Sequence, residues 1–271
     1  MQRYGMIAAG LGELPYVNYD DVPRVLACLP PRADSGLPRW SASQPIIPRS
    51  EWQEVSYARA DLPVLDQGRY GSCVGHGACS GFTLAWLLGG GSFNRLSPCF
   101  LYGLINGGRD SGAVVSDAMT ALEATGICLE EEIPEGMIYR SRFPSSAFAT
   151  ARRFRLDKAY QCHSFDEIGS ALLLGFIPVY GINVGPDFAR LDDEGVAPVG
   201  GWGGHCMFGR GLKRSRRGDW LVENQNSWGE QFGIGGACYL REAHFGGQCD
   251  AFAIQATAED PLEPDTPPSI A

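Results

Sequence analysis

The pattern of apolar and polar positions divides the chain into a helical first half and a strand-rich second half. Residues 73–88 form a long stretch without proline, which predicts a helix, although Gly75, Gly77 and Gly81 each cost about 1 kcal/mol relative to alanine. The glycines therefore indicate that other elements pack closely against this helix. Ser97 followed by Pro98 predicts a second helix, capped by the serine and running to about residue 106.

Two further helices are indicated by spacing and by capping signals. Residues 117–125 repeat apolar side chains at helical spacing and are closed by Gly126. Ser164 and Glu167 have the spacing of a capping box, ahead of an apolar stretch that ends at Gly175. The first half of the core is therefore predicted to be mainly helical.

From Phe176 onward the apolar runs become short, with glycine and proline between them. Such runs predict the strands of an antiparallel sheet or barrel, at residues 176–184, 205–212, 220–224, 237–240 and 251–255. Helices followed by strands, rather than alternating with them, is the α+β pattern. We therefore expect a helical lobe at about 58–150 and a β-rich lobe at about 151–256, with a cleft between them.

Both ends of the chain have a different composition. Residues 1–57 are rich in proline and predict an extended arm, which we hypothesise stays near the cleft as a short pro-segment, a permanent brace or an assembly arm. Residues 257–271 mix prolines with acidic residues and predict a flexible acidic tail. Either end could carry a contact with an assembly partner.

Composition excludes several classes of function. The 271 residues are 44% hydrophobic and 20% charged, and none of the apolar runs approaches eighteen residues, so we expect a soluble globular protein without a membrane span. A net charge of −9 repels nucleic acid and anionic lipid, so we expect neither as a partner. The nine scattered cysteines and the lack of a secretory apolar region at the N-terminus favour a reducing, cytoplasmic location, with virion association as an alternative.

One cysteine has the surroundings of a nucleophile. Cys73 follows Gly-Ser at the head of the first predicted helix, where the helix dipole and the unpaired backbone N–H groups favour a thiolate. His205 and Asn226 lie 205 − 73 = 132 and 226 − 73 = 153 residues downstream. A papain-type nucleophile has its His and Asn about 130 to 150 residues downstream, so the order and the spacing agree.

From about Asp61 to Ile254, the chain resembles the papain family of cysteine peptidases, particularly its disulfide-poor microbial and viral members. The motifs that carry this resemblance are Gln67-Gly-x-x-Gly-Ser-Cys73, Leu96-Ser-Pro98 with Phe100-Leu-Tyr102, Asp110-Ser-Gly112, Gly204-His205, Asn226-Ser-Trp228-Gly229, and Gly233 with Gly236-Ala-Cys-Tyr239. Each motif is weak alone, but together in this order they are highly specific.

The resemblance implies a papain-like fold and assigns roles to the motif residues. Cys73 would be the nucleophile, His205 the acid and base, Asn226 the group that orients the imidazole, and Gln67 a donor of the oxyanion hole. The predicted substrate-binding residues are Gly112, Gly204 and Trp228, and Trp228 would also shield the His–Asn hydrogen bond. No cofactor is implied.

The chain departs from the common form of the family in three respects. The residue three before the nucleophile, usually a disulfide cysteine, is Tyr70, and the residue after the nucleophile, usually Trp, is Val74. The segment before Cys73 is too short for the family's long helical propeptide. The missing disulfide suits a reducing compartment.

Other interpretations were weighed against this one. Cys73, His76 and Cys79 stand at i, i+3 and i+6, which spreads three ligands over about 120° of a helix and disfavours a shared metal ion. His76 is expected to be a packing or cleft-rim residue, and Cys206 a core residue that points to the opposite face from His205. The basic run at residues 213–217 predicts a solvated hairpin loop.

Three functions stay open at this stage. The first is hydrolysis of peptide bonds by an endopeptidase or exopeptidase. The second is a structural or virion-associated assembly protein that retains the peptidase fold. The third is an acyltransferase that uses the same acyl-enzyme.

Overall fold

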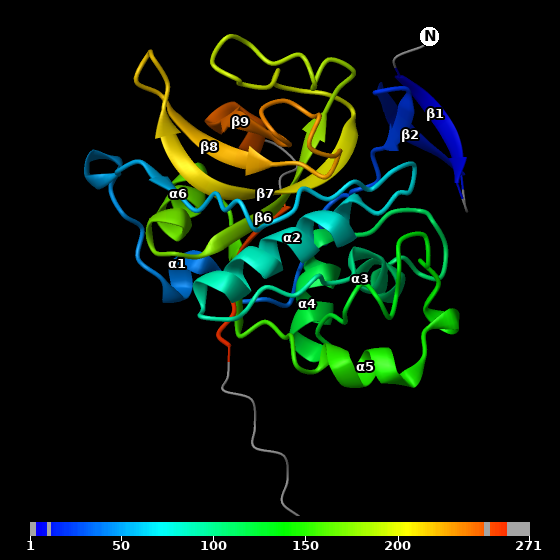
Figure 1. Ribbon diagram of the computed structural model, residues 1–271. Coiled ribbons are helices and arrows are strands. Elements are labelled where there is room, and N and C mark those ends of the chain that lie inside the picture. The colour runs from blue at the N-terminus through cyan, green and yellow to red at the C-terminus, as the bar shows by residue number, and fades with distance from the viewer. Residues whose placement is uncertain (1–3, 10–11, 247–249, 259–271) are drawn as a thin grey trace, which may run out of the picture.

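The computed structural model describes residues 4–9, 12–246 and 250–258 of the chain. Its helices are α1 (Trp40–Ser43), α2 (Cys73–Leu88), α3 (Pro98–Ile105), α4 (Val115–Ala124), α5 (Ser145–Ala151) and α6 (Phe165–Leu173). Its strands are β1 (Tyr4–Ala9), β2 (Gly12–Tyr19), β3 (Val22–Val25), β4 (Val55–Ser56), β5 (Lys158–Cys162), β6 (Ile177–Val184), β7 (Gly203–Arg214), β8 (Trp220–Gln225), β9 (Ala237–Arg241) and β10 (Asp250–Gln255). Figure 1 shows the large sheet on one side of α2, and α3, α4 and α5 on the other.

Helix α2 is the central element, and its bounds are the ones that the sequence predicts. Nearly all of its residues are buried, because α3 packs on one face and β6 and β7 on another. A Cβ on Gly75 would lie 2.6 Å from the carbonyl oxygen of Pro98, and one on Gly77 would lie 3.0 Å from the carbonyl oxygen of Cys206. The glycines therefore allow both lobes to approach the nucleophile helix, as expected from their helix-weakening cost.

The capping signals are also confirmed. The Ser97 hydroxyl accepts a hydrogen bond of 2.9 Å from the N–H of Phe100, and the Ser164 hydroxyl accepts one of 3.1 Å from Glu167. Helix α4 begins at Val115, two residues before the predicted start, because its N-cap residue is Val114, which offers no side-chain cap to reveal the boundary.

The second lobe is built on an antiparallel sheet with strand order β5-β10-β6-β7-β8-β9, and β4 also pairs with β7. All five predicted strands are present, which confirms the α+β class. Among the described strands the sheet stays open, so the barrel-like lobe that we expected is a curved sheet and not a closed barrel. Pairing of β6 with β7 and of β7 with β8 places His205 on the central strand of this sheet.

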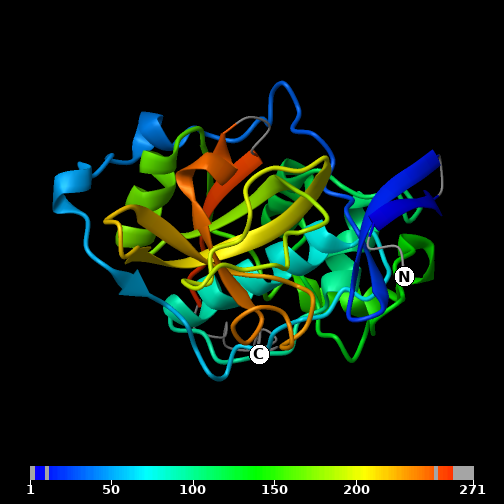
Figure 2. The ribbon, with the colours of Figure 1, turned by 90° about the horizontal axis from the view of Figure 1, so that it is seen from above.

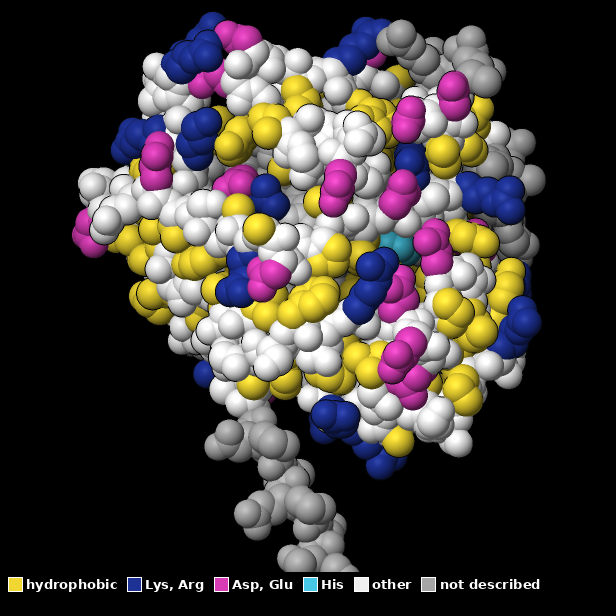
Figure 3. All heavy atoms as spheres, viewed as in Figure 1, with side chains coloured by type: hydrophobic (Ala, Val, Ile, Leu, Met, Phe, Trp, Pro, Cys, Tyr) yellow, Lys and Arg dark blue, Asp and Glu magenta, His cyan; other side chains and the backbone are white. Residues whose placement is uncertain are grey.

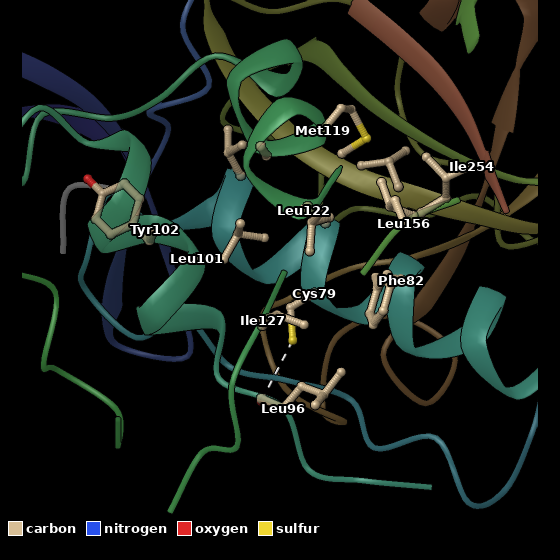
Figure 4. Close-up of a cluster of buried hydrophobic side chains, with 14 of the residues drawn as sticks. Cys79, Phe82, Leu96, Leu101, Tyr102, Met119, Leu122, Ile127, Leu156 and Ile254 are labelled. Atoms are coloured by element: carbon tan, nitrogen blue, oxygen red, sulfur yellow. Dashed lines mark hydrogen bonds between the residues drawn. The ribbon is translucent and has the colours of Figure 1, made fainter. Parts of the chain in front are cut away.

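Two clusters of buried apolar side chains support the two lobes. The first surrounds α2, where Phe82, Met119, Leu122 and Ile127 come together, and Cys79 lies 3.7 Å from the carbonyl oxygen of Leu96 (Figure 4). The second lies between the large sheet and α6. No helix among the described residues combines the length and the apolar character needed to cross a membrane.

The N-terminal arm is more structured than its composition predicts. Strands β1, β2 and β3 form a separate three-stranded antiparallel sheet at the edge of the molecule (Figures 1 and 2), with Asp20 and Asp21 in the left-handed conformation at the β2–β3 turn. Further along the arm, Trp40 and Trp52 are buried in the core of the second lobe. The arm therefore forms part of the packed structure. The predicted flexible tail lies outside the described residues from residue 259 onward.

Candidate active site

The predicted nucleophile, Cys73, is the first residue of α2 and is fully buried. Burial raises the pKa of its thiol, because a thiolate loses its hydration there. Hydrogen bonds from backbone groups of Cys206, Ala27 and Val74 act in the opposite direction, since they stabilise a negative sulfur. The positive end of the helix dipole adds to them. The strongest influence on this thiol is therefore burial, and the arm residue Ala27 is one of the groups that cover it.

The predicted base, His205, lies on β7 and meets Asn226, which follows β8. The imidazole Nε2 donates to the Asn226 side-chain oxygen over 2.7 Å, and Nδ1 has no partner among the described residues. The indole of Trp228 packs on the imidazole, with ring centroids 4.9 Å apart. Burial lowers the pKa of His205 to about 4, although the hydrogen bond to Asn226 raises it. The described site therefore holds a neutral imidazole whose orientation is fixed by Asn226.

Gln67 is buried beside the nucleophile loop, defined as residues 68–72 before Cys73. Its amide nitrogen points at backbone carbonyl groups. It donates to the carbonyl oxygen of Val25 over 3.2 Å and to that of Tyr70 over 3.0 Å. Its side-chain oxygen accepts a hydrogen bond of 3.0 Å from the Ser227 hydroxyl, which fixes the amide orientation. Gln67 is thus oriented to donate to carbonyl oxygens, and one of the two that it binds here, that of Val25, belongs to the arm.

The arm segment, defined as residues 24–29, runs through the site in one direction. Arg24 contacts Asp66, the Val25 carbonyl meets Gln67, and the Ala27 N–H meets the sulfur of Cys73. The Cys28 N–H then donates to the Gly204 carbonyl over 3.0 Å. The arm segment therefore lies against Gln67, Cys73 and Gly204.

The glycine segment, defined as residues 110–113 before α4, lies on the other side of the arm segment. The backbone N–H of Ala113 donates to the Ala27 carbonyl over 3.1 Å, and the Ala113 carbonyl accepts from the Leu29 N–H over 2.8 Å. Gly112 itself donates to the hydroxyl of Tyr102 over 3.0 Å. Its backbone has a φ of +88°, and a Cβ there would lie 2.3 Å from the Ala27 carbonyl oxygen. Ala113 therefore makes the peptide-like hydrogen bonds, and Gly112 provides the space for them.

The two other predicted substrate-binding residues differ in what they contact. Gly204 lies against the arm segment, since a Cβ at this position would be 2.0 Å from the Cys28 carbonyl oxygen. Trp228 is 1% exposed and contacts His205, Tyr19 and Phe232. In this structure Trp228 shields the imidazole, and its contacts are not those of a residue lining an open cleft.

A hydrogen-bonded pair that the sequence analysis did not single out joins the nucleophile loop to the glycine segment. The Tyr102 hydroxyl donates to Asp110 over 2.8 Å, and the same carboxylate accepts from the Gly71 N–H over 2.9 Å. Tyr102 and Asp110 both lie in quoted motifs, but no spacing rule links them. The pair connects the two segments on either side of Cys73.

His76 and Cys79, the other His and Cys side chains of α2, are buried in this structure. His76 is buried, and its Nδ1 is 3.0 Å from the Ser72 carbonyl oxygen. Burial lowers its pKa to about 4. Within residues 4–9, 12–246 and 250–258, His, Cys, Asp and Glu side chains nowhere gather in a group of three or more that could hold a metal ion.

Comparisons with known proteins bear on the fold of the chain. No protein-family model matches the chain, and no curated protein sequence matches it. Solved structures do match: xylellain, a cysteine protease from Xylella fastidiosa, is 20% identical with a TM-score of 0.71, over 85% of this chain and 96% of xylellain. ProCathepsin B S9 from Trypanosoma congolense is 15% identical with a TM-score of 0.67, over 86% and 87% of the two chains. Digestive procathepsin L 3 from the Tenebrio molitor larval midgut is 18% identical with a TM-score of 0.62, over 81% and 73%. The chain therefore has the fold of the papain-like cysteine proteases.

Proposed function

We propose that this chain is a thiol peptidase that its own N-terminal arm segment keeps latent. The proposal rests on a helix-terminal thiol influenced by the backbone of Cys206, the residue after His205, on the hydrogen bond of the His205 imidazole to Asn226, and on the Gln67 amide that donates to a backbone carbonyl. These are the groups that acyl transfer to a thiol requires. Peptides or proteins are accordingly the expected substrates.

The proposed reaction begins with transfer of the Cys73 proton to Nδ1 of His205, which gives a thiolate and an imidazolium. The thiolate attacks the carbonyl carbon of the scissile bond, and the carbonyl oxygen becomes negative beside the Gln67 amide and the Cys73 N–H. The imidazolium then protonates the leaving amine, which leaves an acyl-enzyme. Water, deprotonated by His205, hydrolyses the thioester and restores the thiol. Asn226 keeps the imidazole in the orientation that serves both halves of this cycle.

Latency follows from the path of the arm segment. The Val25 carbonyl accepts a hydrogen bond from the Gln67 amide, and a backbone group of Ala27 acts on the Cys73 thiol. A substrate carbonyl and the arm segment cannot use the same donor at once. Activity therefore requires displacement of residues 24–29, with or without cleavage of the chain.

The nucleophile can be tested with the full-length chain. We expect a peptide vinyl sulfone to label wild-type protein after the arm opens, with the adduct mapped to Cys73 by mass spectrometry. Cys73→Ala should lose both labelling and peptide hydrolysis. Cys79→Ala is the matched control, because this second buried cysteine lies on the same helix and outside the proposed machinery. Hydrolysis that persists in Cys73→Ala would contradict the proposal.

Intact mass measurement addresses the fate of the arm. A truncation within residues 1–57 that appears during incubation of wild type, but not of Cys73→Ala, would identify self-processing. An unchanged mass together with activity would identify an arm that opens without cleavage.

The two alternative functions have separate readouts. Products formed in the presence of an added amine distinguish acyl transfer to that amine from hydrolysis, because the aminolysis product has a different mass. The assembly hypothesis predicts arms that dock on neighbouring subunits. Here the arm segment docks on the site of its own chain, so this observation favours the latent peptidase.

A further inference from the structure

The first residue of the arm segment, Arg24, occupies a distinct acidic site. Its side chain is 4% exposed and forms an ion pair with both carboxylate oxygens of Asp66, with Nη2 to Oδ2 at 3.0 Å. Nη1 also lies 3.4 Å from the Gly68 carbonyl oxygen. The Asp66 side chain is 48% exposed, so the guanidinium is covered while its acidic partner remains at the rim.

A second carboxylate belongs to the same site. Glu135 lies near Gly68, where a Cβ would be 3.5 Å from Glu135 Oε1. The pKa of Glu135 is raised chiefly by burial and also by the charge of Asp66, whereas the charge of Arg24 lowers it. Glu130, the next nearby acid, is already paired with Arg95. Asp66 is therefore the acid that pairs with Arg24, and Glu135 is a second, nearby carboxylate whose charge Arg24 influences.

The acidic site has a fixed position relative to the reacting groups. Arg24 immediately precedes Val25, whose carbonyl binds Gln67, whereas Ala27 to Leu29 pair with the glycine segment on the other side of Cys73. The acidic site therefore lies next to the oxyanion donor and on the side away from Ala113. A side chain of a bound substrate, one or two positions from the scissile bond, would reach it.

We propose that Asp66 and Glu135 form a subsite that selects a basic side chain of the substrate, and that Arg24 fills this subsite in the latent chain. The proposal rests on the proposed peptidase function and adds a substrate class to it: peptides with arginine or lysine beside the scissile bond. A planar guanidinium pairs with a carboxylate through two parallel hydrogen bonds. The buried Nε of Arg24 has no hydrogen-bond partner among the described residues, so the guanidinium does not use all of its donors in this site.

Charge makes the subsite selective once the arm segment has left. Two carboxylates next to each other without Arg24 repel, and a basic substrate residue relieves that repulsion, whereas an acidic one increases it. On the side of the N-terminal sheet and α3, acidic side chains at the surface lie among basic ones (Figure 3), so the selectivity depends on the carboxylates of the subsite itself.

The test uses the full-length Arg24→Ala variant, in which the subsite is vacated. Alanine-rich peptides carry a single arginine at each position around the cleaved bond, with citrulline at the same position as the uncharged isostere. We expect kcat/KM about tenfold higher for arginine than for citrulline at one position, as for a charge-assisted bidentate pair. Adding Asp66→Asn should reduce this ratio toward one. Asparagine keeps the side-chain oxygen that accepts from the Gly68 N–H over 2.8 Å, so the turn is preserved while the charge is lost.

Binding separates this proposal from the peptidase function. Calorimetry with Cys73→Ala/Arg24→Ala measures the arginine and citrulline peptides without turnover. Arginine-selective binding that Asp66→Asn abolishes would support the subsite even if no variant hydrolyses a peptide. Equal kcat/KM for the two peptides at every position in an active enzyme would overturn the subsite and leave the peptidase function intact.

A second variant protects the test against misfolding. Arg24→Gln retains most of the side-chain stem that packs in the site, and circular dichroism of both variants identifies the folded one. The same arginine-to-citrulline ratio is then measured in that variant. A ratio near one that does not respond to Asp66→Asn would again overturn the proposal.

Discussion

The two ends of the arm segment are held by different physical interactions. On the side of the glycine segment, Ala27, Cys28 and Leu29 make three main-chain hydrogen bonds with Ala113 and Gly204. At the other end, Arg24 makes an ion pair with Asp66. Main-chain pairing accepts almost any sequence, whereas an ion pair depends on one side chain and responds to salt. In the proposed enzyme, one end of the site would therefore bind peptides in general, and the other would discriminate among them.

Gly204→Ala should disrupt the main-chain hydrogen bonds that hold the arm segment, and it should increase the labelling rate of Cys73 more than any other variant. The new Cβ would lie 2.0 Å from the Cys28 carbonyl oxygen, so the arm segment must move away. The backbone at Gly204 is not in the left-handed region, so this clash is the main consequence. We expect labelling of Cys73 to accelerate about 100-fold. This is equivalent to a loss of about 2.7 kcal/mol in the free energy of closure, the binding of the arm segment over Cys73.

The matched control for this substitution is Gly185→Ala, whose Cβ would meet only ordinary contacts at 3.4 Å. It should label at the wild-type rate. Equal labelling of Gly204→Ala and wild type would show that main-chain pairing contributes little to closure.

Arg24→Glu should disrupt the ion pair at the other end of the arm segment. Placing a carboxylate against Asp66 and Glu135 replaces an attraction by a repulsion, so we expect Cys73 labelling to rise by about 30-fold, and less for Arg24→Ala.

Salt distinguishes the ion pair from the main-chain hydrogen bonds. Added NaCl should speed labelling of wild type and have little effect on Arg24→Ala, because the screened ion pair is already absent there. A salt response that survives in Arg24→Ala would assign the effect to other charges.

Acid should open the site through the buried imidazoles. Burial lowers the pKa values of His205 and His76 to about 4, from an ordinary value of 6.5. An open site with hydrated imidazoles binds protons first, so closure is favoured above pH 6.5 and is lost as the pH falls toward 4. We expect a loss of amide exchange protection of at least about tenfold at residues 27–29 between pH 7 and pH 5, after correction for the intrinsic rates. Constant protection over this range would show that the imidazoles stay covered when the arm moves.

The sequence predicted the elements that carry the site better than it predicted what occupies the site. Cys73 to Leu88 and the capping residue Ser97 follow from local rules, because glycine, proline and hydroxyl side chains act within one helical turn. Contacts between Arg24 and Asp66 join residues 42 positions apart, and no periodicity encodes such a pair. The proline content of residues 1–57 also concealed β1 to β3, whose strands are stabilised by pairing with each other and by packing of Tyr19 on Trp228.

Tyr102→Phe should have the smallest effect on Cys73 labelling. It tests how the glycine segment, which binds the main chain of the arm segment, is held in place. In the common form of the family that this chain resembles, the residue at Tyr70 is a disulfide cysteine; here the nearby Gly71 N–H binds Asp110, which Tyr102 holds in turn. Loss of the hydroxyl leaves the buried Gly112 N–H without its acceptor, at a cost of about 1 to 2 kcal/mol.

We expect urea unfolding to show this loss for Tyr102→Phe, and Cys73 labelling to rise only a few-fold, because the Ala113 hydrogen bonds to the arm segment remain. Tyr139→Phe is the matched control, since that hydroxyl lies on a 40% exposed side chain away from this network. Labelling of Tyr102→Phe at the wild-type rate, with unaltered stability, would mean that backbone packing alone keeps the two segments together.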